Sequence, residues 1–581
     1  MTAALGEPDG ERDVERVRRR LVAFLLRSCE ALITRPFCVV PAPENGRRVQ
    51  WRAENLMSFL CFLRVALLTL ALNAAAVAGE TLAPDRVMTE AQARAMLARF
   101  GYGPTPKSLQ AASEQTPRAF LRRAISEEST LPPAIGERLD QLAGEPLEVV
   151  WARYGTGGNA VPSAQDIEAR KEIRKLIRQY GNAEIERRLL TMANGDNPGH
   201  EALLSFWLNH FSVYARKGAS ELLVGDYIRK LEAAMRADSF EALLRASFFH
   251  PAMQIYLDNQ RSVSPDSQTG RQASRRGKRA GINENLAREL LELHTLGVDG
   301  GYGQRDVQEL ARIITGAGVL SAKASEEQLI KVGGMRDGYF SFDPRRHDFG
   351  SKHFLGTDFP AGEGLAEIDR ALHLMSVHPA TAAHVATRLA QRFLADEPPA
   401  AVVAAMADAY LHSGGRISAM LSALIESSAF AASLAAPGKF KEPLDYVLSV
   451  ARAACGDQPI GNGRALASAA GDMGQLPMMR TTPDGYGSQE ADWLSPVAMA
   501  RRVRFATAVA TGRVPLAASA ASAAGSGIGE GSAAVRACLA DPGQIEKMVG
   551  TPSAATRAAA TGLPPAQQAA LLLASPAFMR R

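Results

Sequence analysis

The sequence predicts a large all-α globular protein. Three observations support this prediction. Apolar residues recur at helical spacing along most of the chain, alternating β-branched runs are nearly absent, and a composition of 46% hydrophobic and 22% charged residues is ordinary for a folded protein. The 581 residues are enough to bury a substantial core. We expect one small β-hairpin near residues 338–356.

A secretory signal peptide is predicted at residues 57–78. The segment contains one arginine, then a short apolar run, then an A-x-A cleavage pattern at residues 76–78. Cleavage there would release a chain that is exported to the periplasm or the extracellular space and no longer attached to a membrane. Without cleavage, the same segment would act as a membrane anchor, although it is short for a stable span.

Residues 1–56 precede this signal and are rich in arginine without a clear pattern. We interpret them as a non-native extension upstream of a working start at Met57. The alternative is a cytoplasmic tail in front of an anchor.

Residues 79–581 are predicted to form a single helical domain. Thr89 is a candidate N-cap for its first amphipathic helix. Helical patterns follow at residues 167–192, 201–214, 238–249, 361–376, 381–394, 400–412 and 417–427. Two polar or low-complexity segments, 261–281 and 517–534, are predicted to be flexible loops.

Charge and motifs exclude several function classes. The net charge of +5 is small for this length, and no basic stripe with interleaved aromatic residues indicates nucleic-acid binding. We find no GxGxxG or P-loop pattern, so we expect no nucleotide cofactor, and no GxSxG pattern for a serine nucleophile. CxxC, HExxH and Cys/His arrays are also missing, so we predict no structural metal site.

Two cysteines remain after the predicted signal, Cys455 and Cys538. They would form one disulfide in an oxidising compartment. The alternative is two unpaired apolar side chains, and the sequence does not decide between them.

The helix that follows Asn283 has an unusual number of charges. On a helical wheel Leu286, Leu290 and Leu293 form a core face and Leu291 lies apart from them. Asn283 is a candidate N-cap and Gly297 a candidate C-terminal stop. The polar stripe between the two apolar regions consists of Asn285, Arg288, Glu289 and Glu292.

Two interpretations of this stripe stay open. A solvated face with Glu284–Arg288 and Arg288–Glu292 pairs explains it without any function. A stripe that lines a cleft would instead be a functional site, because buried carboxylates are costly unless they are paired or hydrogen-bonded.

His210 lies in a segment, residues 201–214, that is apolar nearly all round. A helix with this pattern is buried, so we expect His210 to be buried too. It is either a core histidine bonded to a backbone carbonyl or a site residue that faces a carboxylate.

A third polar segment, FSFDPRRHDFGSKHFLG at residues 340–356, is broken by proline and glycine. Its acids and histidines lie on a loop, where polar side chains often serve a ligand. The relevant residues are Asp343, Arg345, Arg346, His347, Asp348 and His353.

Together these blocks resemble a known family. FWLNHF, NENLARELLELHTLGVDGGYGQRDVQELARIITG and FDPRRHDFGSKHFLG are similar to the hallmark blocks of the bacterial DUF1800 family, whose function is unknown, and the similarity extends over residues 89–581. The resemblance implies an exported, helix-rich protein with a co-exported, sulfatase-like partner. Leu208 stands where members often have a histidine, and Ala317 where tryptophan is common.

The function we favour from the sequence is a carboxylate-dependent hydrolase that acts on a cell-envelope or extracellular glycan. The candidate catalytic residues are Glu289, Glu292, Asp343 and Asp348, which would supply a general acid and a base or nucleophile. The candidate substrate-binding residues are His210, Asn209, Asn283, Asn285, Arg288, His294, His347 and Arg346.

Two alternatives remain. One is a non-enzymatic envelope binding or assembly protein, and the other is a metal-dependent hydrolase centred on His347 and His353. The favoured hypothesis requires the three polar segments to converge on one partly dry hollow.

Overall fold

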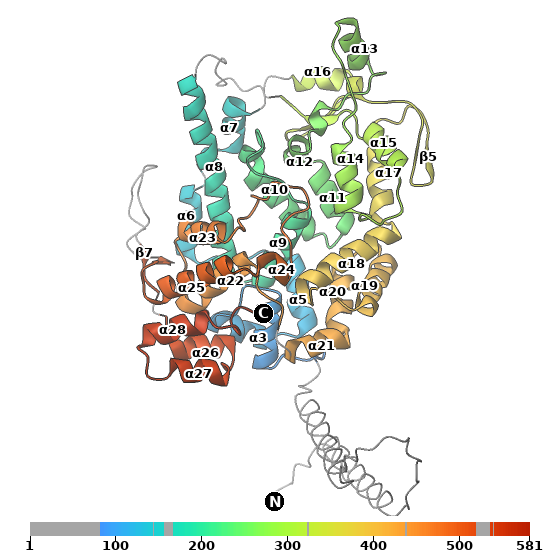
Figure 1. The fold of residues 1–581 in the computed structure, drawn as a ribbon. Helices are drawn as coiled ribbons and strands as arrows, with labels where there is room; N and C mark the ends of the chain where they lie inside the picture. Colours follow the sequence, from blue (N-terminus) through green and yellow to red (C-terminus); the bar gives the residue numbers. More distant parts are fainter. Residues whose placement is uncertain are drawn as a thin grey trace, which may run out of the picture. The chain divides into compact units, whose positions relative to one another are not determined.

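Most of the described chain is helical and its few strands are short, which confirms the all-α fold class (Figure 1). The computed structural model describes residues 82–581 except 143, 156–166, 322–324, 436–437, 519–534 and 539. The predicted N-terminal extension and signal segment lie outside the described residues, as does most of the predicted loop at 517–534.

The first half of the described chain consists of helices joined by short connections: α3 (Glu90–Arg99), α4 (Pro106–Ser113), α5 (Pro117–Ser126), α6 (Pro133–Leu142), α7 (Leu147–Tyr154), α8 (Ile167–Asn194), α9 (Pro198–His210), α10 (Ser220–Met235), α11 (Phe240–Phe248), α12 (Pro251–Tyr256), η1 (Asn259–Arg261), α13 (Gln268–Arg275), α14 (Asn285–Glu289), η2 (Leu290–His294) and α15 (Gln304–Ile313). The second half continues in the same way: α16 (Glu326–Lys331), η3 (Pro344–Arg346), α17 (Leu365–Ser376), α18 (Pro379–Phe393), α19 (Ala400–Ser413), α20 (Ile417–Glu426), α21 (Ser428–Ala435), α22 (Pro443–Cys455), α23 (Gly463–Asp472), α24 (Glu490–Trp493), α25 (Pro496–Ala510), α26 (Pro542–Val549), α27 (Ala554–Ala560) and α28 (Pro565–Leu573).

Local sequence explains where many of these helices begin. Thr89 caps α3, as predicted, through a reciprocal pair of hydrogen bonds with Gln92. In α5 and α9 a proline occupies the first turn directly after a capping Thr116 or Asn197. Proline suits this position because the N–H that it lacks would have no partner inside the helix.

Three buried apolar clusters hold the described helices together. The largest joins α3–α5, α9–α12, α14, α15 and α17–α20, and the second joins α8, α22, α23, α25, α26 and α28. A small third cluster of Ile135, Leu139 and Leu190 joins α6 to α8. Within them α18 packs on α19 and α19 on α20, while α25 and α26 both pack on α28 (Figure 1). Every residue of α22 is buried, so this helix runs through the interior.

The strands are short and form three small antiparallel sheets. β1 (Ala317–Val319), β3 (Phe340–Phe342) and β2 (Met335–Asp337) pair in that order, β4 (Lys352–Phe354) pairs with β5 (Thr357–Phe359), and β6 (Ala517–Ala518) pairs with β7 (Val535–Arg536). The predicted single hairpin at 338–356 is therefore two hairpins. Gly338 (φ 56°) turns β2 into β3, and Leu355 and Gly356 (φ 47° and 73°) turn β4 into β5. Positive φ at these positions matches the tight turns that hairpins favour.

The predicted loop at 261–281 contains one helix, α13, which Ser267 caps at its N-terminus. The polar sequence of this helix has no apolar periodicity, so the sequence pattern did not reveal it.

Among the described residues, no single helix combines the length and apolar composition that a membrane span requires. The pair Ile417–Glu426 and Ser428–Leu434 meets the criteria only when counted together, across a bend of 68°.

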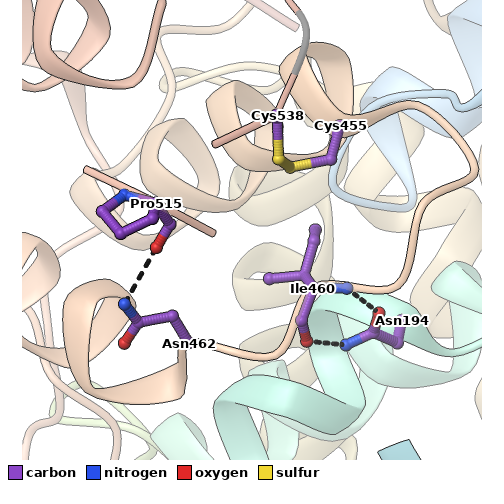
Figure 2. The surroundings of a disulfide bond; sticks show 6 residues. All are labelled: Asn194, Cys455, Ile460, Asn462, Pro515 and Cys538. Carbon is purple, nitrogen blue, oxygen red and sulfur yellow. Dashed lines mark hydrogen bonds between the residues drawn. A yellow bond between two sulfur atoms is a disulfide. The ribbon is translucent and has the colours of Figure 1, made fainter. Parts of the chain in front are cut away.

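Cys455, at the end of α22, and Cys538 form a disulfide with a Cα–Cα distance of 4.8 Å (Figure 2). The sequence had left this pairing open. Beside it, Asn194 exchanges two hydrogen bonds with the backbone of Ile460, and Asn462 donates to the carbonyl of Pro515. The disulfide and these amides attach the chain after α22 to α8 and to the segment before β6.

The helix after Asn283 departs from the wheel that the sequence predicts. Its N-cap is Glu284, while the Asn283 side chain accepts a hydrogen bond from the backbone of Asn285. After α14 the chain widens into the π-helical turn η2. The wider turn changes which side chains face inward, so Leu291 and His294 are fully buried whereas Leu293, predicted for the core face, is only half-buried.

Gly297 ends this helix, as predicted. Its φ is +84°, and its N–H donates to the carbonyl of Leu291 at 3.0 Å. A Cβ at this position would lie 2.7 Å from Nδ1 of His384, whose other ring nitrogen bonds to the carbonyl of Leu293.

We expect Gly297→Ala to lower the free energy of unfolding by about 2–3 kcal/mol, because it combines a left-handed backbone with a steric clash. Gly301→Ala is the matched control, since Gly301 has the same φ of +84° but no atom within 4 Å of an added Cβ. The control should lose only about 1–2 kcal/mol in chemical denaturation. Equal losses in the two variants would contradict a clash with His384.

Candidate functional site

The polar stripe after Asn283 divides into two parts. In the first, Arg288 pairs with Glu284 at 3.1 Å, and Gln304 bonds to both side chains. A solvated, internally paired face accounts for this part. In the second, Glu289 and Glu292 are half-buried and have no ion-pair or hydrogen-bond partner within the described part of the chain. These two carboxyl groups remain available to a ligand.

Glu289 is in an environment that favours its neutral form. Burial raises its pKa, and the nearby carboxylates of Glu292 and Asp484 raise it further, against the opposing effect of Arg288. A carboxyl group in such a place stays protonated to a higher pH than usual and can donate a proton.

Asp484 is the carboxylate that the sequence reasoning missed. It lies in the loop before α24. Burial opposes its ionisation, but hydrogen bonds from Arg480 (Nη2–Oδ2 3.1 Å) and Thr482 outweigh burial and lower its pKa. Asp484 is therefore an ionised carboxylate close to a carboxyl group, Glu289, that resists ionisation.

Tyr256 connects these two acids. Its hydroxyl donates to the carbonyl of Thr481 at 3.0 Å, which attaches the end of α12 to the loop that bears Asp484. Burial raises the pKa of Tyr256, and the negative charges of Glu289 and Asp484 raise it further. The tyrosine thus lies within electrostatic reach of both.

His210 is buried, as expected, and its ring does not face a carboxylate. Its Nε2–H donates to the carbonyl of His294 at 3.0 Å, which fits the core-histidine interpretation. Burial lowers its pKa well below the ordinary value, and His384 and His294 add to that effect. His210 therefore connects α9 to η2 as a neutral ring.

His294 is also neutral. Burial lowers its pKa to about 3, and neither ring nitrogen has a hydrogen-bond partner among the described residues. Asn209, next to His210, exchanges two hydrogen bonds with the backbone of Tyr486 at 2.9 and 2.7 Å. This amide holds the Asp484 loop against α9.

The third segment is paired internally. Asp343 binds Arg345 at 2.8 Å, and Asp348 binds Arg312 through both carboxylate oxygens at 3.1 Å. Arg346 donates to the backbone carbonyls of Gln260 and Ser262.

The histidines of this segment have separate acidic partners. His347 lies 2.6 Å from the buried carboxylate of Glu367, which also binds Lys352 at 2.6 Å. His353 bonds to the exposed Asp358. Each ring therefore faces a different carboxylate.

The three segments do not converge on one hollow, so the requirement of the favoured hypothesis is not met for the Asp343–His353 segment, and Asp343 and Asp348 are wrong as catalytic candidates. Asn283 and Asn285 attach the start of α14 to the chain near residues 257–262, through Ser262 and the carbonyl of Leu257. His347 and Asp348 line a surface pocket with Arg271 and Arg312, and neither Glu289 nor Glu292 lines it. Glu289 instead lies within electrostatic range of Asp484, whereas Asp343 and Asp348 are paired with Arg345 and Arg312.

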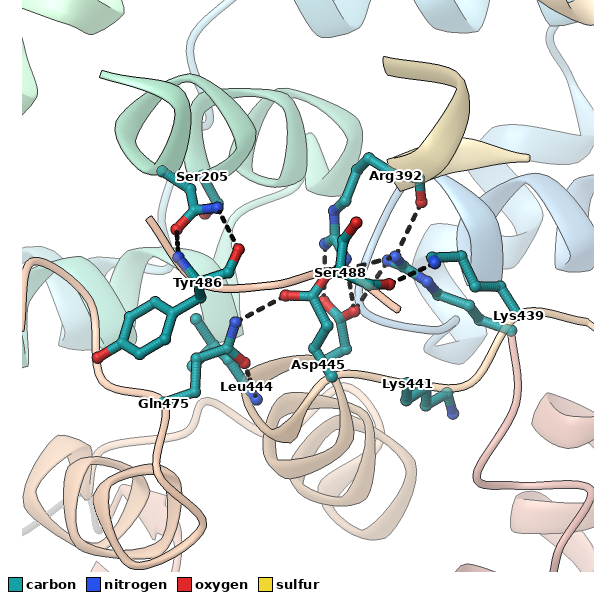
Figure 3. Close-up of polar contacts among 12 residues, drawn as sticks. Ser205, Arg392, Lys439, Lys441, Leu444, Asp445, Gln475, Tyr486 and Ser488 are labelled. Carbon is teal, nitrogen blue, oxygen red and sulfur yellow. Dashed lines mark hydrogen bonds and ion pairs between the residues drawn. The ribbon is translucent and has the colours of Figure 1, made fainter. Parts of the chain in front are cut away.

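A narrow polar cavity of about 70 Å³ lies beside the Asp484 loop. Its lining includes Asn209, Arg388, Arg392, Asp445, Arg480 and Tyr486. On one wall Arg392 reaches from α18 to Asp445 of α22, and Gln475 bonds to the neighbouring Glu442 (Figure 3). In the sequence, the arginines of α18 have a pattern that is typical of a solvated helix face. The sequence therefore did not identify them as site residues.

A model of the family described as "Protein of unknown function (DUF1800)" matches residues 95–580. Searches of curated proteins and of solved structures found no match. The region matched by the family model contains every residue of the site described above.

Proposed function

The chain belongs to the DUF1800 family of unknown function, and from that premise we propose that it is a hydrolase that uses Glu289 as general acid and Asp484 as base or nucleophile. We propose a glycan of the cell envelope or the extracellular space as its substrate. Glu292 and Tyr256 complete the polar surface around the two acids.

One observation supports this proposal above the others. Two carboxyl groups near one another have pKa values shifted in opposite directions, Glu289 upward and Asp484 downward. Such a pair provides an acid and a base at the same pH, as glycoside hydrolysis requires.

The reaction follows from these protonation states. Glu289 gives its proton to the oxygen of the leaving sugar as the glycosidic C–O bond breaks. Asp484 removes a proton from the attacking water, or attacks the sugar carbon itself and is released by water in a second step. In the direct route, proton exchange with solvent then restores the proton of Glu289 and the charge of Asp484, and in the two-step route Glu289 regains its proton from the water that releases the sugar, so either route consumes one water.

The proposal includes export. Disulfides persist in oxidising compartments, and the Cys455–Cys538 bond supports such a location. The co-exported, sulfatase-like partner stays a prediction.

The two alternatives have less support. A binding or assembly protein would neutralise its polar stripe by internal pairing, and Glu289 and Glu292 lack such partners in the described region. A metal-dependent hydrolase centred on His347 and His353 would need the two rings to share a site, but they bond to different acids.

We expect Glu289→Gln and Asp484→Asn each to lower the rate of glycan hydrolysis at least about 100-fold, because each removes one proton-transfer group. Wild-type activity should rise as Asp484 ionises and fall as Glu289 ionises, which produces a bell-shaped pH profile. The measurement is release of reducing ends from cell-envelope polysaccharides.

Glu284→Gln is the matched control, since Glu284 lies on the same helix and its charge is paired with Arg288. It should keep near-wild-type activity. Full activity in Glu289→Gln would refute the assignment of the acid. Failure of the wild type to cleave any envelope glycan would favour the binding alternative.

A further inference from the structure

Arg388 of α18 differs from the other arginines that line the polar cavity. Arg188 pairs with Glu201, Arg392 with Asp445 and Glu442, and Arg480 with Asp484. Arg388 is only partly exposed and has no ion-pair or hydrogen-bond partner anywhere in the described part of the chain.

An unpaired guanidinium in such a place is unfavourable for the folded protein alone. Burial lowers the pKa of Arg388, and the more distant Glu442 and Asp484 only partly oppose this effect. Its neighbours His210 and His384 offer no negative charge, and the charge of Arg388 helps to lower the pKa of both rings. Buried cations are normally paired, so a missing partner indicates a ligand that supplies the charge.

The cavity has the size and polarity for a small anionic group. Its volume of about 70 Å³ exceeds that of a single water site. The two carboxylates on its wall, Glu442 and Asp445, are both paired with Arg392, which leaves the charge of Arg388 uncompensated. A guanidinium binds carboxylate, sulfate and phosphate oxygens through two parallel hydrogen bonds. The unpaired Arg388 therefore fits an oxyanion of this kind.

The cavity also lies next to the proposed catalytic pair. Arg480 lines it and bonds directly to Asp484. A substrate whose anionic group is bound by Arg388 would therefore place its scissile bond near Asp484.

We propose that this cavity is an anion subsite, in which Arg388 binds a carboxylate, sulfate or phosphate group carried by the substrate. The substrate class is then an acidic glycan, such as a uronic acid polymer or a sulfated or phosphorylated saccharide. The link to hydrolysis rests on the proposed function, whereas the binding of the anion does not.

Isothermal titration with glucuronate, sulfate and inorganic phosphate tests the subsite, and neutral glucose serves as the uncharged comparison. We expect at least one anion to bind the wild type and glucose not to bind. Arg388→Gln should weaken that binding about 10- to 100-fold, and Arg388→Lys, which keeps the charge, should weaken it less. The preferred anion distinguishes the carboxylate, sulfate and phosphate sources.

Arg416→Gln is the matched control, because Arg416 is exposed and its guanidinium also lacks a partner among the described residues. It should bind the anion like the wild type. Thermal unfolding provides a second measurement: Arg388→Gln should be as stable as the wild type or more stable, since it removes an unpaired cation. A destabilised Arg388→Gln with unchanged anion affinity would overturn the proposal, as would a wild type that binds none of the three anions.

The subsite and the hydrolase can fail separately. Glu289→Gln should bind the anion as tightly as the wild type. Anion binding that depends on Arg388, in a protein without glycan hydrolysis, would support the subsite and refute the hydrolase. Hydrolysis that depends on Glu289, with equal rates on acidic and neutral glycans in both wild type and Arg388→Gln, would refute the subsite alone.

Discussion

Replacing Asp445 by asparagine is expected to lower the free energy of unfolding by about 3–5 kcal/mol at neutral pH. Asp445 is buried on α22 and accepts two hydrogen bonds from Arg392, at 2.8 and 2.9 Å, while Arg581 lies 2.9 Å from the same carboxylate (Figure 3). An amide cannot balance these two guanidinium groups, and among the described residues only Glu442 is then left as an ion-pair partner for them. The loss arises from buried cations without a counterion.

The effect should depend on pH in a defined direction. Burial opposes ionisation of Asp445, but the charges of Arg392 and Arg581 outweigh it and lower the pKa below the ordinary value of 3.8. A carboxylate with a lowered folded-state pKa stabilises the protein above its unfolded pKa, and this contribution is lost as the pH falls through the folded value. The difference between wild type and Asp445→Asn should therefore shrink below about pH 4.

Asp85→Asn is the control for this experiment. Asp85 also binds an arginine, Arg118, through both oxygens, but its side chain is 74% exposed, compared with 3% for Asp445. We expect a much smaller loss of stability for this solvent-exposed pair. Urea denaturation at several pH values measures both variants, and equal losses would contradict the role we assign to burial.

Removal of the disulfide is expected to lower the free energy of unfolding by about 4 kcal/mol. Cys455 and Cys538 are 83 residues apart, so the bond closes a long loop and restricts the unfolded chain. The double variant Cys455→Ser/Cys538→Ser removes the crosslink while it keeps side chains of similar size.

Reductant provides the internal control. It should lower the stability of the wild type to that of the double variant and leave the double variant unchanged. A wild type that is insensitive to reductant in its unfolding transition would contradict a stabilising crosslink.

Local patterns predicted the helices well where apolar periodicity was strong. The prediction of a helix at 400–412 agrees with α19, and that at 167–192 with α8, to within two residues. The polar helix α13 was missed because it has no apolar face to detect. The π-helical turn η2 was missed because a helical wheel assumes a constant 100° per residue.

The candidate site was only partly predictable. Glu289 and Glu292 stood out because carboxylates interrupt a leucine-rich helix, and both remain without partners in the described structure. Asp343 and Asp348 stood out because they lie on a loop broken by proline and glycine, yet each of them pairs with an arginine, Arg345 or Arg312. The difference lies in whether a cation reaches the carboxylate, which Arg345 does from the same turn and Arg312 does from α15.

The sequence by itself determined the helical fold class, the start of many helices, the stop at Gly297 and the family. These features depend on periodicity, capping residues and glycine φ, which act over a few neighbouring residues. Only the tertiary structure decided which charged side chains lack an ion-pair partner among the described residues. Asp484 acts electrostatically on Glu289, although the two residues lie far apart in sequence. Arg388 has no ion-pair partner among the described residues, while Arg392, one turn later, has two. Charge pairing and desolvation depend on distances between such remote segments, and local sequence does not specify those distances.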